Sequence, residues 1–284
     1  IVKTKYPAKF DGVNESEISF AEVSDKDITD VTSMDIYEFL SYAANDLDNK
    51  GDSRARKLSC LRSFYKYLTV TRNIIEDNPT QKIDSPKRNK KYPKFLSLDQ
   101  SKQLLSAIDG KNKERDYAII TLFLNCGLRV SELAGINLSD IDSEMTTLYV
   151  TGKGSKQRIL YLNDACRDAL KSYLKVRPGN AKSKDADALF ISRNHNRMSV
   201  KTVQYMIYQR LKQSDLGNLH MSVHKLRHTA ATLMYKYGKT DVRVLKDILG
   251  HEEMSTTQIY THVSDDQQKQ AIDSNPLSHL KQNK

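Results

Sequence analysis

Hydrophobic residues recur at intervals of three and four along much of the chain, which is the spacing of helices with one buried face. In the first hundred residues this spacing predicts a helix over residues 33–44 and a second helix over residues 57–68. The second predicted helix also carries basic side chains, with Arg62 and Lys66 one turn apart on the same face. We therefore predict that the first part of the chain is a small helical bundle with one basic helix.

Helix signals return in the second part of the chain. Ser97 and Gln100 have the spacing of a capping box, which marks a helix start. Residues 117–125 are mostly apolar and precede Gly127, a residue type that commonly ends helices. Further helices are predicted after Ser199, over residues 222–237, over residues 241–249, and from a last capping box at Ser255 and Gln258.

The hydrophobic period changes between these helices. Residues 146–150 and 157–162 are rich in β-branched and aromatic side chains, and a segment with two glycines around Lys153 separates them. This arrangement is typical of a β-hairpin. The predicted fold class is therefore mainly α with a small antiparallel β-sheet.

Composition narrows the class of protein. The 284 residues are enough for two domains, and 38% of them are hydrophobic, which suffices for buried cores. No apolar run approaches the ~18 residues of a membrane span, so we expect no membrane partner. The cysteines, Cys60, Cys126 and Cys166, have no CxxC spacing. We therefore expect no disulfide framework, no zinc site and a reducing compartment, the cytoplasm.

The positive charge of the chain is concentrated. The net charge is +10, with −6 over residues 1–50, +8 over residues 51–94 and +8 over the remainder. Residues 85–93 have a proline near each end and a run of basic residues between them, which is typical of an extended linker. An extended basic segment can neutralise phosphates, so we predict that Lys87, Arg88, Lys90 and Lys91 contact DNA.

Several polar residues lie in positions that suit phosphate chemistry. His224 and Arg227 are three apart on one helix face. Arg129 follows a helix-ending glycine in an apolar context and needs an anionic partner there, for which Glu132 is the candidate. Lys153 lies between two glycines at the predicted hairpin tip. Each of these features taken alone also fits an ordinary structural role.

Taken in order, the motifs resemble those of the tyrosine recombinases, the phage-integrase family, and Xer-type recombinases in particular. The motifs are Gly127-Leu-Arg-Val-Ser-Glu-Leu, Thr151-Gly-Lys-Gly-Ser-Lys-Gln-Arg, His224-Lys-Leu-Arg-His-Thr, Leu249-Gly-His and Ile259-Tyr-Thr-His. The resemblance implies a helical, SAM-like core-binding domain followed by an α-rich catalytic domain of the tyrosine recombinase type. It also implies an enzyme that cleaves and rejoins duplex DNA through a 3′-phosphotyrosine intermediate.

The resemblance assigns six catalytic residues, Arg129, Lys153, His224, Arg227, His251 and Tyr260. Two arginines suit a transition state that gathers negative charge on the phosphate oxygens. Tyr260 is the implied nucleophile, His224 the candidate general base and Lys153 the candidate general acid for the leaving 5′-oxygen. His251 would donate a hydrogen bond to the phosphate.

Two further residues are expected to support this machinery. Glu132 would orient Arg129, and His228, one turn from His224, is expected to be structural. We expect no metal and no cofactor, because the sequence has no H-E-x-x-H motif and no Walker lysine loop.

The remaining candidate sites are DNA contacts. Lys201, Thr202 and Gln204 lie outside the apolar stripe of the helix after Ser199 and are predicted to enter the major groove. Lys156 and Arg158 flank the hairpin tip and are predicted to reach backbone phosphates. Arg54, Arg56, Arg62 and Lys66 are the predicted contacts of the first domain.

The expected domains are a core-binding domain over residues 1–84, a basic linker over residues 85–95, a catalytic domain over residues 96–263 and a C-terminal tail over residues 264–284. The family's first core-binding helix is mostly missing before Phe10, so we expect this domain to be truncated or to begin differently. Expected partners are duplex DNA with an inverted-repeat site, copies of the chain that form a tetramer on DNA, exchanging the tail, and an accessory protein or second recombinase.

Two other functions stay open on the sequence. A type IB topoisomerase uses the same chemistry to relax DNA without a specific site, and a non-catalytic DNA-binding regulator can keep the fold. Among recombinases, Xer proteins usually have a proline in the second hairpin strand, where this chain reads Arg158-Ile-Leu-Tyr-Leu. That departure favours a mobile-element integrase over housekeeping chromosome resolution.

Overall fold

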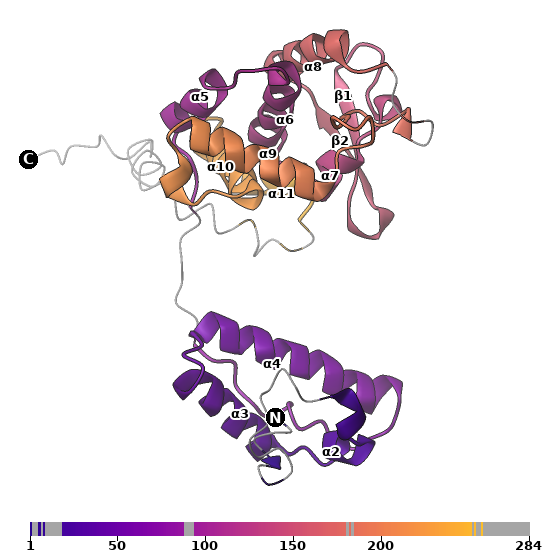
Figure 1. Ribbon diagram of the computed structural model, residues 1–284, viewed down its shortest axis with the longest axis vertical. Helices are drawn as coiled ribbons and strands as arrows, with labels where there is room; N and C mark the ends of the chain where they lie inside the picture. Colours follow the sequence, from indigo (N-terminus) through magenta and orange to yellow (C-terminus); the bar gives the residue numbers. More distant parts are fainter. Residues whose placement is uncertain are drawn as a thin grey trace, which may run out of the picture. The chain divides into compact units, whose positions relative to one another are not determined.

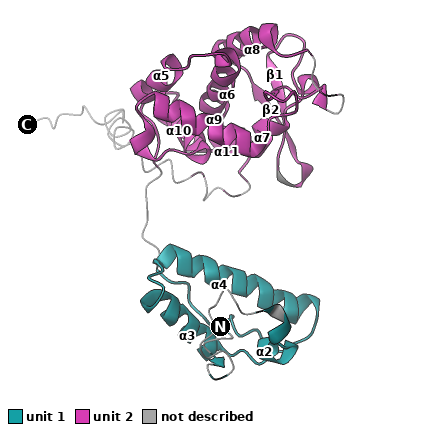
Figure 2. Cartoon of the chain, viewed as in Figure 1, with its two compact units in different colours: residues 1–91 teal, residues 92–284 magenta. Residues whose placement is uncertain are grey.

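The structure, a computed structural model, describes residues 1, 5–6, 8, 19–87, 94–179, 182, 185–251, 253 and 257. The chain divides into two compact units, residues 1–91 and residues 92–284 (Figure 2). Each unit has a hydrophobic core of its own. The basic segment predicted as a linker spans the division between the units, and residues 88–93 of this segment lie outside the described residues.

The first unit is a small helical bundle. Its helices are α2 (Asp25–Thr29), α3 (Ser33–Asn45) and α4 (Gly51–Lys66), and a π-helical segment, Tyr67–Thr71, continues α4 (Figure 1). The two helices predicted for this region are confirmed as α3 and α4. The helix α4 begins earlier than the apolar pattern indicated, because none of the residues of its first turn is buried. Ile36 of α3 and Leu58 of α4 are completely buried in one cluster.

The second unit is mainly helical and carries a two-stranded sheet (Figure 1). Its main elements are α5 (Leu98–Ser106), α6 (Lys113–Cys126), α7 (Val130–Gly135), β1 (Thr147–Thr151), β2 (Gln157–Tyr161), α8 (Asp164–Val176), α9 (Val200–Gln213), α10 (Val223–Lys236) and α11 (Val242–Leu249). The helix α6 packs against α5, α8, α9 and α10. Residues 118–124 are therefore all buried, which explains their continuous apolar run.

The predicted hairpin is confirmed. Strands β1 and β2 pair antiparallel, with Thr147 opposite Tyr161 and Val150 opposite Arg158. Leu160 and Val150 are buried, and Arg158 shares their side of the hairpin because side chains alternate along a strand. The mainly α fold class with a small antiparallel sheet is thus confirmed.

The helix start and stop signals also hold where the structure describes them. Ser97 accepts a hydrogen bond from the Gln100 amide, and the Gln100 side chain accepts one from the Ser97 amide. Gly127 ends α6 and Gly250 ends α11, both with left-handed backbone. The capping box predicted at Ser255 lies outside the described residues.

Two negative findings concern the described part of the chain. None of its helices has the length and apolar character needed to cross a membrane. All three cysteines are free, and the buried Cys126 and Cys166 approach each other with their Sγ atoms 4.0 Å apart.

Candidate active site

Arg129 lies where α6 ends and α7 begins. Gly127 turns the chain with a φ of 59°, and a Cβ atom there would lie 2.7 Å from a methyl carbon of Leu249. This sharp turn makes Arg129 the residue that precedes the first turn of α7, with 37% of its side chain exposed. Its guanidinium donates to the carbonyl of Gly250 at 2.8 Å and to Oε1 of Glu132 at 2.7 Å.

Arg227 reaches the same place from α10 and is only 2% exposed. Its Nη1 donates to the carbonyl of Gly127 at 2.8 Å, and its Nη2 donates to the carbonyl of Leu249. The same Nη1 lies 3.8 Å from Oε2 of Glu132. A buried guanidinium is a permanently charged donor that favours an anion beside it.

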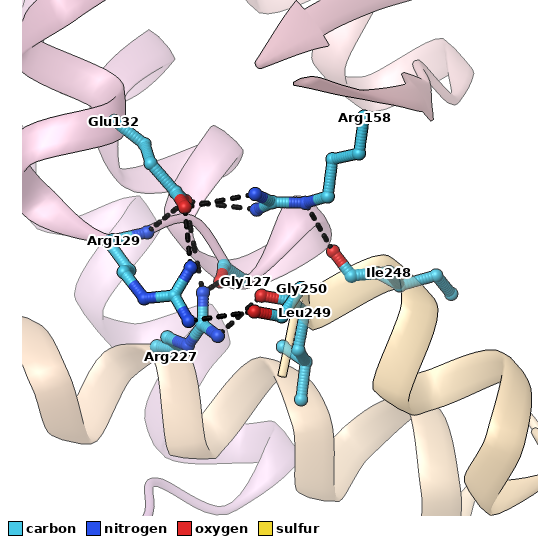
Figure 3. A network of polar contacts seen from close by, with 8 residues as sticks. All are labelled: Gly127, Arg129, Glu132, Arg158, Arg227, Ile248, Leu249 and Gly250. Carbon is cyan, nitrogen blue, oxygen red and sulfur yellow. Dashed lines mark hydrogen bonds and ion pairs between the residues drawn. The ribbon is translucent and has the colours of Figure 1, made fainter. Parts of the chain in front are cut away.

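Glu132 holds the arginines together (Figure 3). Its carboxylate, 2% exposed, accepts hydrogen bonds from the backbone amide and the guanidinium of Arg129, and from both Nη atoms of Arg158. Burial by itself would raise the pKa of Glu132, but these hydrogen bonds and charges, led by Arg158, lower the pKa to about 2. One carboxylate therefore faces three arginines, so among these four side chains positive charge is in excess. The expectation that Glu132 pairs with Arg129 is confirmed.

Three histidines lie near this cluster. His224 is exposed on the first turn of α10. Its ring packs edge to face against that of His228, with the ring centroids 4.6 Å apart. Burial and the nearby guanidiniums of Arg227 and Arg129 lower the pKa of His224. Burial and neighbouring positive charge also lower the pKa values of His228 and His251 to about 4. All three rings are therefore neutral near pH 7, and a neutral imidazole can accept a proton.

His251 follows the end of α11 and connects the cluster to the segment that precedes Tyr260. Its Nδ1 lies 2.9 Å from Oγ1 of Thr257, a completely buried residue three positions before Tyr260. Tyr260 itself lies outside the described residues, so its role as nucleophile stays a prediction.

Lys153 begins the tight turn Lys153–Ser155 that joins β1 to β2. Gly154 in this turn has a φ of 70°, which glycine adopts without strain. The backbone placement agrees with the predicted hairpin tip, whereas the Lys153 side chain lies outside what the structure describes.

Two open cavities meet at Arg129. One, of about 650 Å³, is lined by Arg129, Lys156, Lys246 and His251 among others. The other, of about 550 Å³, is lined by Arg129, Gln204, Tyr208, His224 and Arg227 among others. Arg129 therefore lines both cavities, and Arg158 and Arg227 each line one of them.

The helix α9 presents the predicted major-groove residues to solvent. Lys201, Thr202 and Gln204 are all exposed, while Val203 and Ile207 are buried in the core. Gln204 lines the same cavity as Arg227, so a ligand bound at the arginines would lie near α9. Contact of these three residues with DNA stays a prediction.

Arg158, predicted to reach a DNA phosphate, has hydrogen-bond partners within the protein. Its Nη atoms each donate to Glu132 at 2.9 Å, its Nε donates to the carbonyl of Ile248 at 2.9 Å, and its side chain is 15% exposed. These hydrogen bonds tie Arg158 to α7 and α11, and the residue also lines the cavity that contains Arg129, so its contact with DNA stays a prediction. Lys156, the other residue predicted to flank the tip, is exposed.

The predicted DNA contacts of the first unit differ in their exposure and in their partners. Arg56, Lys66 and Lys87 are exposed, and Arg54 is partly buried. Arg62 donates to the carbonyl of Ile83 and to Oγ of Ser85, so it holds the end of its own unit. Arg88, Lys90 and Lys91 lie outside the described residues.

Sequence reasoning missed three features of the site. Strand alternation could have indicated the internal contacts of Arg158, because it places this residue on the same side as the buried Leu160. Tyr208 lines the cavity beside Gln204, and the one-turn spacing of these two residues was a usable signal. No sequence pattern singled out the hydrogen bond between Thr257 and His251.

Comparison with known proteins identifies the family. Residues 94–267 match the phage integrase family, and residues 14–71 match the N-terminal SAM-like domain of phage integrases. The chain belongs to the phage integrase family. The resemblance inferred from the motifs is thereby confirmed.

Among curated relatives, the tyrosine recombinase XerC of Caldanaerobacter subterraneus subsp. tengcongensis is 54% identical over 260 residues, which is 90% of this chain and 73% of the relative. The tyrosine recombinase XerD of Proteus mirabilis is 39% identical over 244 residues, which is 84% of this chain and 76% of the relative. The chain is a tyrosine recombinase, an enzyme of site-specific DNA recombination.

Solved structures agree in fold. The XerA recombinase is 30% identical with a TM-score of 0.56, and the match covers 86% of this chain and 83% of XerA. The XerH recombinase bound to palindromic difH DNA after cleavage is 21% identical with a TM-score of 0.71, and this match covers 86% of this chain and 72% of XerH.

Proposed function

We propose that the recombinase cleaves each DNA strand with Tyr260 while Arg129 and Arg227 hold the scissile phosphate. The observation that carries this assignment is the convergence of the two guanidiniums at the end of α11, beside His251 and at two cavities that Arg129 lines. Charged donors fixed before the substrate arrives stabilise a transition state without further reorganisation.

The proposed cleavage is an attack of the tyrosine oxygen on phosphorus, accompanied by two proton transfers. The Tyr260 hydroxyl gives its proton to His224, and its oxygen bonds to phosphorus as the bond to the 5′-oxygen breaks. The 5′-oxygen takes a proton from Lys153. The resulting 3′-phosphotyrosine retains the energy of the phosphodiester, so rejoining by attack of a 5′-hydroxyl needs no ATP. Because its pKa is lowered, the ring of His224 is neutral near pH 7 and can accept the proton.

The target and the assembly belong to the same proposal. Exchange between two duplexes requires cleavage of four strands, so one tyrosine per subunit calls for a tetramer on DNA. An inverted-repeat site would place two subunits symmetrically on each duplex. The palindromic DNA bound by XerH supports an inverted repeat here. The tail of residues 264–284, which lies outside the described residues, is proposed to pass between subunits, and a second recombinase or accessory protein is the proposed regulator.

We assign the biological role to the Xer type. The hairpin strand without proline favoured a mobile-element integrase, but the identity of 54% to a XerC protein over most of the chain outweighs that single position. The three free cysteines support action in a reducing compartment, for which we propose the cytoplasm.

Covalent capture from a randomised duplex library tests the proposal. The protein is incubated with the library and denatured, and the DNA that stays attached is sequenced, with Tyr260→Phe as the control. We expect attached DNA that shares an inverted-repeat site and is absent with Tyr260→Phe. Attachment without sequence preference would favour topoisomerase-like relaxation, and salt-sensitive binding without attachment would favour a DNA-binding regulator.

A further inference from the structure

Arg158 connects three elements of the catalytic unit. It extends from the inward side of β2, pairs with Glu132 on α7 through two parallel hydrogen bonds of 2.9 Å, and reaches α11 through the carbonyl of Ile248. Two parallel bonds fix both the distance and the orientation of a guanidinium and a carboxylate. The hairpin that carries Lys153 at its tip is thereby tied to the elements that carry the catalytic arginines (Figure 3).

The end of α11 receives hydrogen bonds from all three arginines. Arg158 donates to the carbonyl of Ile248, Arg227 to that of Leu249 and Arg129 to that of Gly250. Carbonyl groups at a helix end lack partners within the helix and carry partial negative charge, so they suit guanidinium donors. Since His251 directly follows these carbonyls, the three arginines also fix the point from which His251 extends.

Arg158 is also packed closely against the end of α11. A Cβ atom on Gly250 would lie 3.0 Å from Nη1 of Arg158 and 3.3 Å from its Cδ and Cζ atoms. The Arg158 side chain therefore occupies the space beside Gly250 at the point where the helix ends. Its place is determined by both packing and hydrogen bonding.

Charge balance gives Arg158 a second effect. Glu132 is buried and ionised, and a buried carboxylate needs compensating charge. With Arg158 in place, both carboxylate oxygens have a partner besides Arg129. Without Arg158, Glu132 would draw the guanidiniums of Arg129 and Arg227 toward itself and reduce the positive charge available to a phosphate.

We propose that Arg158 is a positioning residue for strand cleavage, which holds Glu132 and the end of α11 so that Arg129, Arg227 and His251 are aligned before DNA binds. This inference rests on the proposed function, since alignment matters only if these residues hold the scissile phosphate. Arg158 acts through its neighbours and does not touch the DNA.

The test compares Arg158→Lys with Arg210→Lys. Arg210 on α9 is a matched control, because it donates two hydrogen bonds to the buried carboxylate of Asp116 on α6. Lysine keeps the charge at either position but cannot form the paired bonds. The measurements are the single-turnover cleavage rate at saturating DNA, on the duplex recovered by covalent capture, and the dissociation constant at several salt concentrations.

For Arg158→Lys we expect the cleavage rate to fall by about 10²-fold, the effect of a small misplacement of reacting groups. Its DNA affinity and salt dependence should match those of the unmodified protein, and Arg210→Lys should cleave at the unmodified rate. Equal cleavage rates for the two variants would overturn the proposal. A weaker affinity with a shallower salt dependence and an unchanged cleavage rate would instead make Arg158 a phosphate contact.

A double-variant comparison separates positioning from general destabilisation. If Arg158 acts through Glu132, then Arg158→Gln combined with Glu132→Gln should cleave no more slowly than Glu132→Gln alone. The double variant removes both charges of the Arg158–Glu132 pair together, so neither is left buried without the other, and it also serves if Arg158→Lys folds poorly. Losses that multiply in the double variant would overturn the action through Glu132.

A last measurement needs no cleavage and so separates this inference from the proposed function. In protein with ¹⁵N-labelled arginine and no DNA, the guanidinium signals of Arg129 and Arg227 should shift or broaden in Arg158→Lys and stay in place in Arg210→Lys. Unchanged signals would overturn the positioning role. Failure of the unmodified protein to cleave any duplex would count against the proposed function alone.

Discussion

At the scale of single residues, the neutral histidines make the stability of the catalytic unit depend on pH. The folded state lowers the pKa values of His228 and His251 to about 4 from an ordinary value of 6.5. The unfolded chain therefore binds more protons between these values, and stability falls as the pH is lowered. The contribution of the histidines is complete above pH 6.5 and is lost progressively toward pH 4. We expect the melting temperature to fall over this range in calorimetry.

Replacing His228 and His251 tests directly whether these two residues cause the pH dependence of stability. In the double variant His228→Gln, His251→Gln, the fall in melting temperature between pH 6.5 and pH 4 should be clearly smaller. Glu132, with a lowered pKa of about 2 against 4.5, contributes stability that is lost only below pH 4.5. An unchanged fall above pH 4.5 in the double variant would show that other groups cause it.

Lys153 offers a test of the proposed proton transfer. Lys153→Ala should slow cleavage by about 10²–10⁴-fold, because the leaving 5′-oxygen then lacks a proton donor. A duplex in which sulfur replaces that 5′-oxygen should restore the rate, since a thiolate leaves without protonation. The readout is single-turnover cleavage of both duplexes. A variant that stays equally slow on the sulfur duplex would show that Lys153 has another role.

The contacts that could be predicted were those between residues of one short sequence motif. Glu132 follows Arg129 by three positions, so their pairing could be read from spacing alone, and the structure confirms it. The contacts of Arg158 could not be read in that way, because its partners come from α7 and α11, far away in sequence. A basic residue near a hairpin tip was interpreted as a DNA contact, although strand alternation already placed it on the buried side.

At the scale of elements, the end of α11 depends on Gly250. Its φ of 64° lies in the left-handed region, and the Arg158 guanidinium lies where a Cβ atom would need space. Gly250→Ala should therefore lower the free energy of unfolding by more than the ~1 kcal/mol typical of alanine in this conformation. It should also slow cleavage at saturating DNA, because the displaced guanidinium no longer holds Glu132.

Gly110→Ala is the matched control for this substitution. Gly110 has a φ of 84° and no atom within 4 Å of the position of a Cβ, so alanine there meets only the backbone strain. We expect a loss of about 1 kcal/mol in chemical denaturation and no change in cleavage. Equal effects of the two substitutions on cleavage would contradict the role assigned to the end of α11.

Element boundaries followed local signals where those signals existed. Capping residues predicted the starts of α5 and α9, and a glycine predicted the end of α6. The helix α8 was not predicted, although Asn163 caps its start, because its apolar residues follow directly on the hairpin strand. The early start of α4 was missed because its first turn packs little against the core.

At the scale of the whole molecule, the net charge of +10 predicts strongly salt-dependent DNA binding. If the exposed basic residues neutralise six or more phosphates, the affinity should fall by about 10³-fold or more between about 50 and 200 mM salt. Fluorescence anisotropy with a labelled duplex measures this dependence. An affinity that barely changes over the range would rule out phosphate contacts as the main source of binding.

The overall organisation could be predicted from the sequence because local patterns and ordered motifs indicated the same kind of protein. Helical periodicity, one hairpin and a basic linker predicted a mainly helical chain, and ordered motifs predicted its family. The arrangement of three arginines around one carboxylate was not accessible, because it depends on how α7, β2, α10 and α11 pack together.

The central claim is that Tyr260 attacks a phosphate held by Arg129 and Arg227. The most direct test is peptide mapping by mass spectrometry of the protein–DNA adduct formed on a nicked duplex that carries the recovered site, in the presence of EDTA. We predict that the DNA is attached to Tyr260 through a 3′-phosphate and that Tyr260→Phe forms no adduct. Attachment at another residue, or DNA cut without attached protein, would contradict the account.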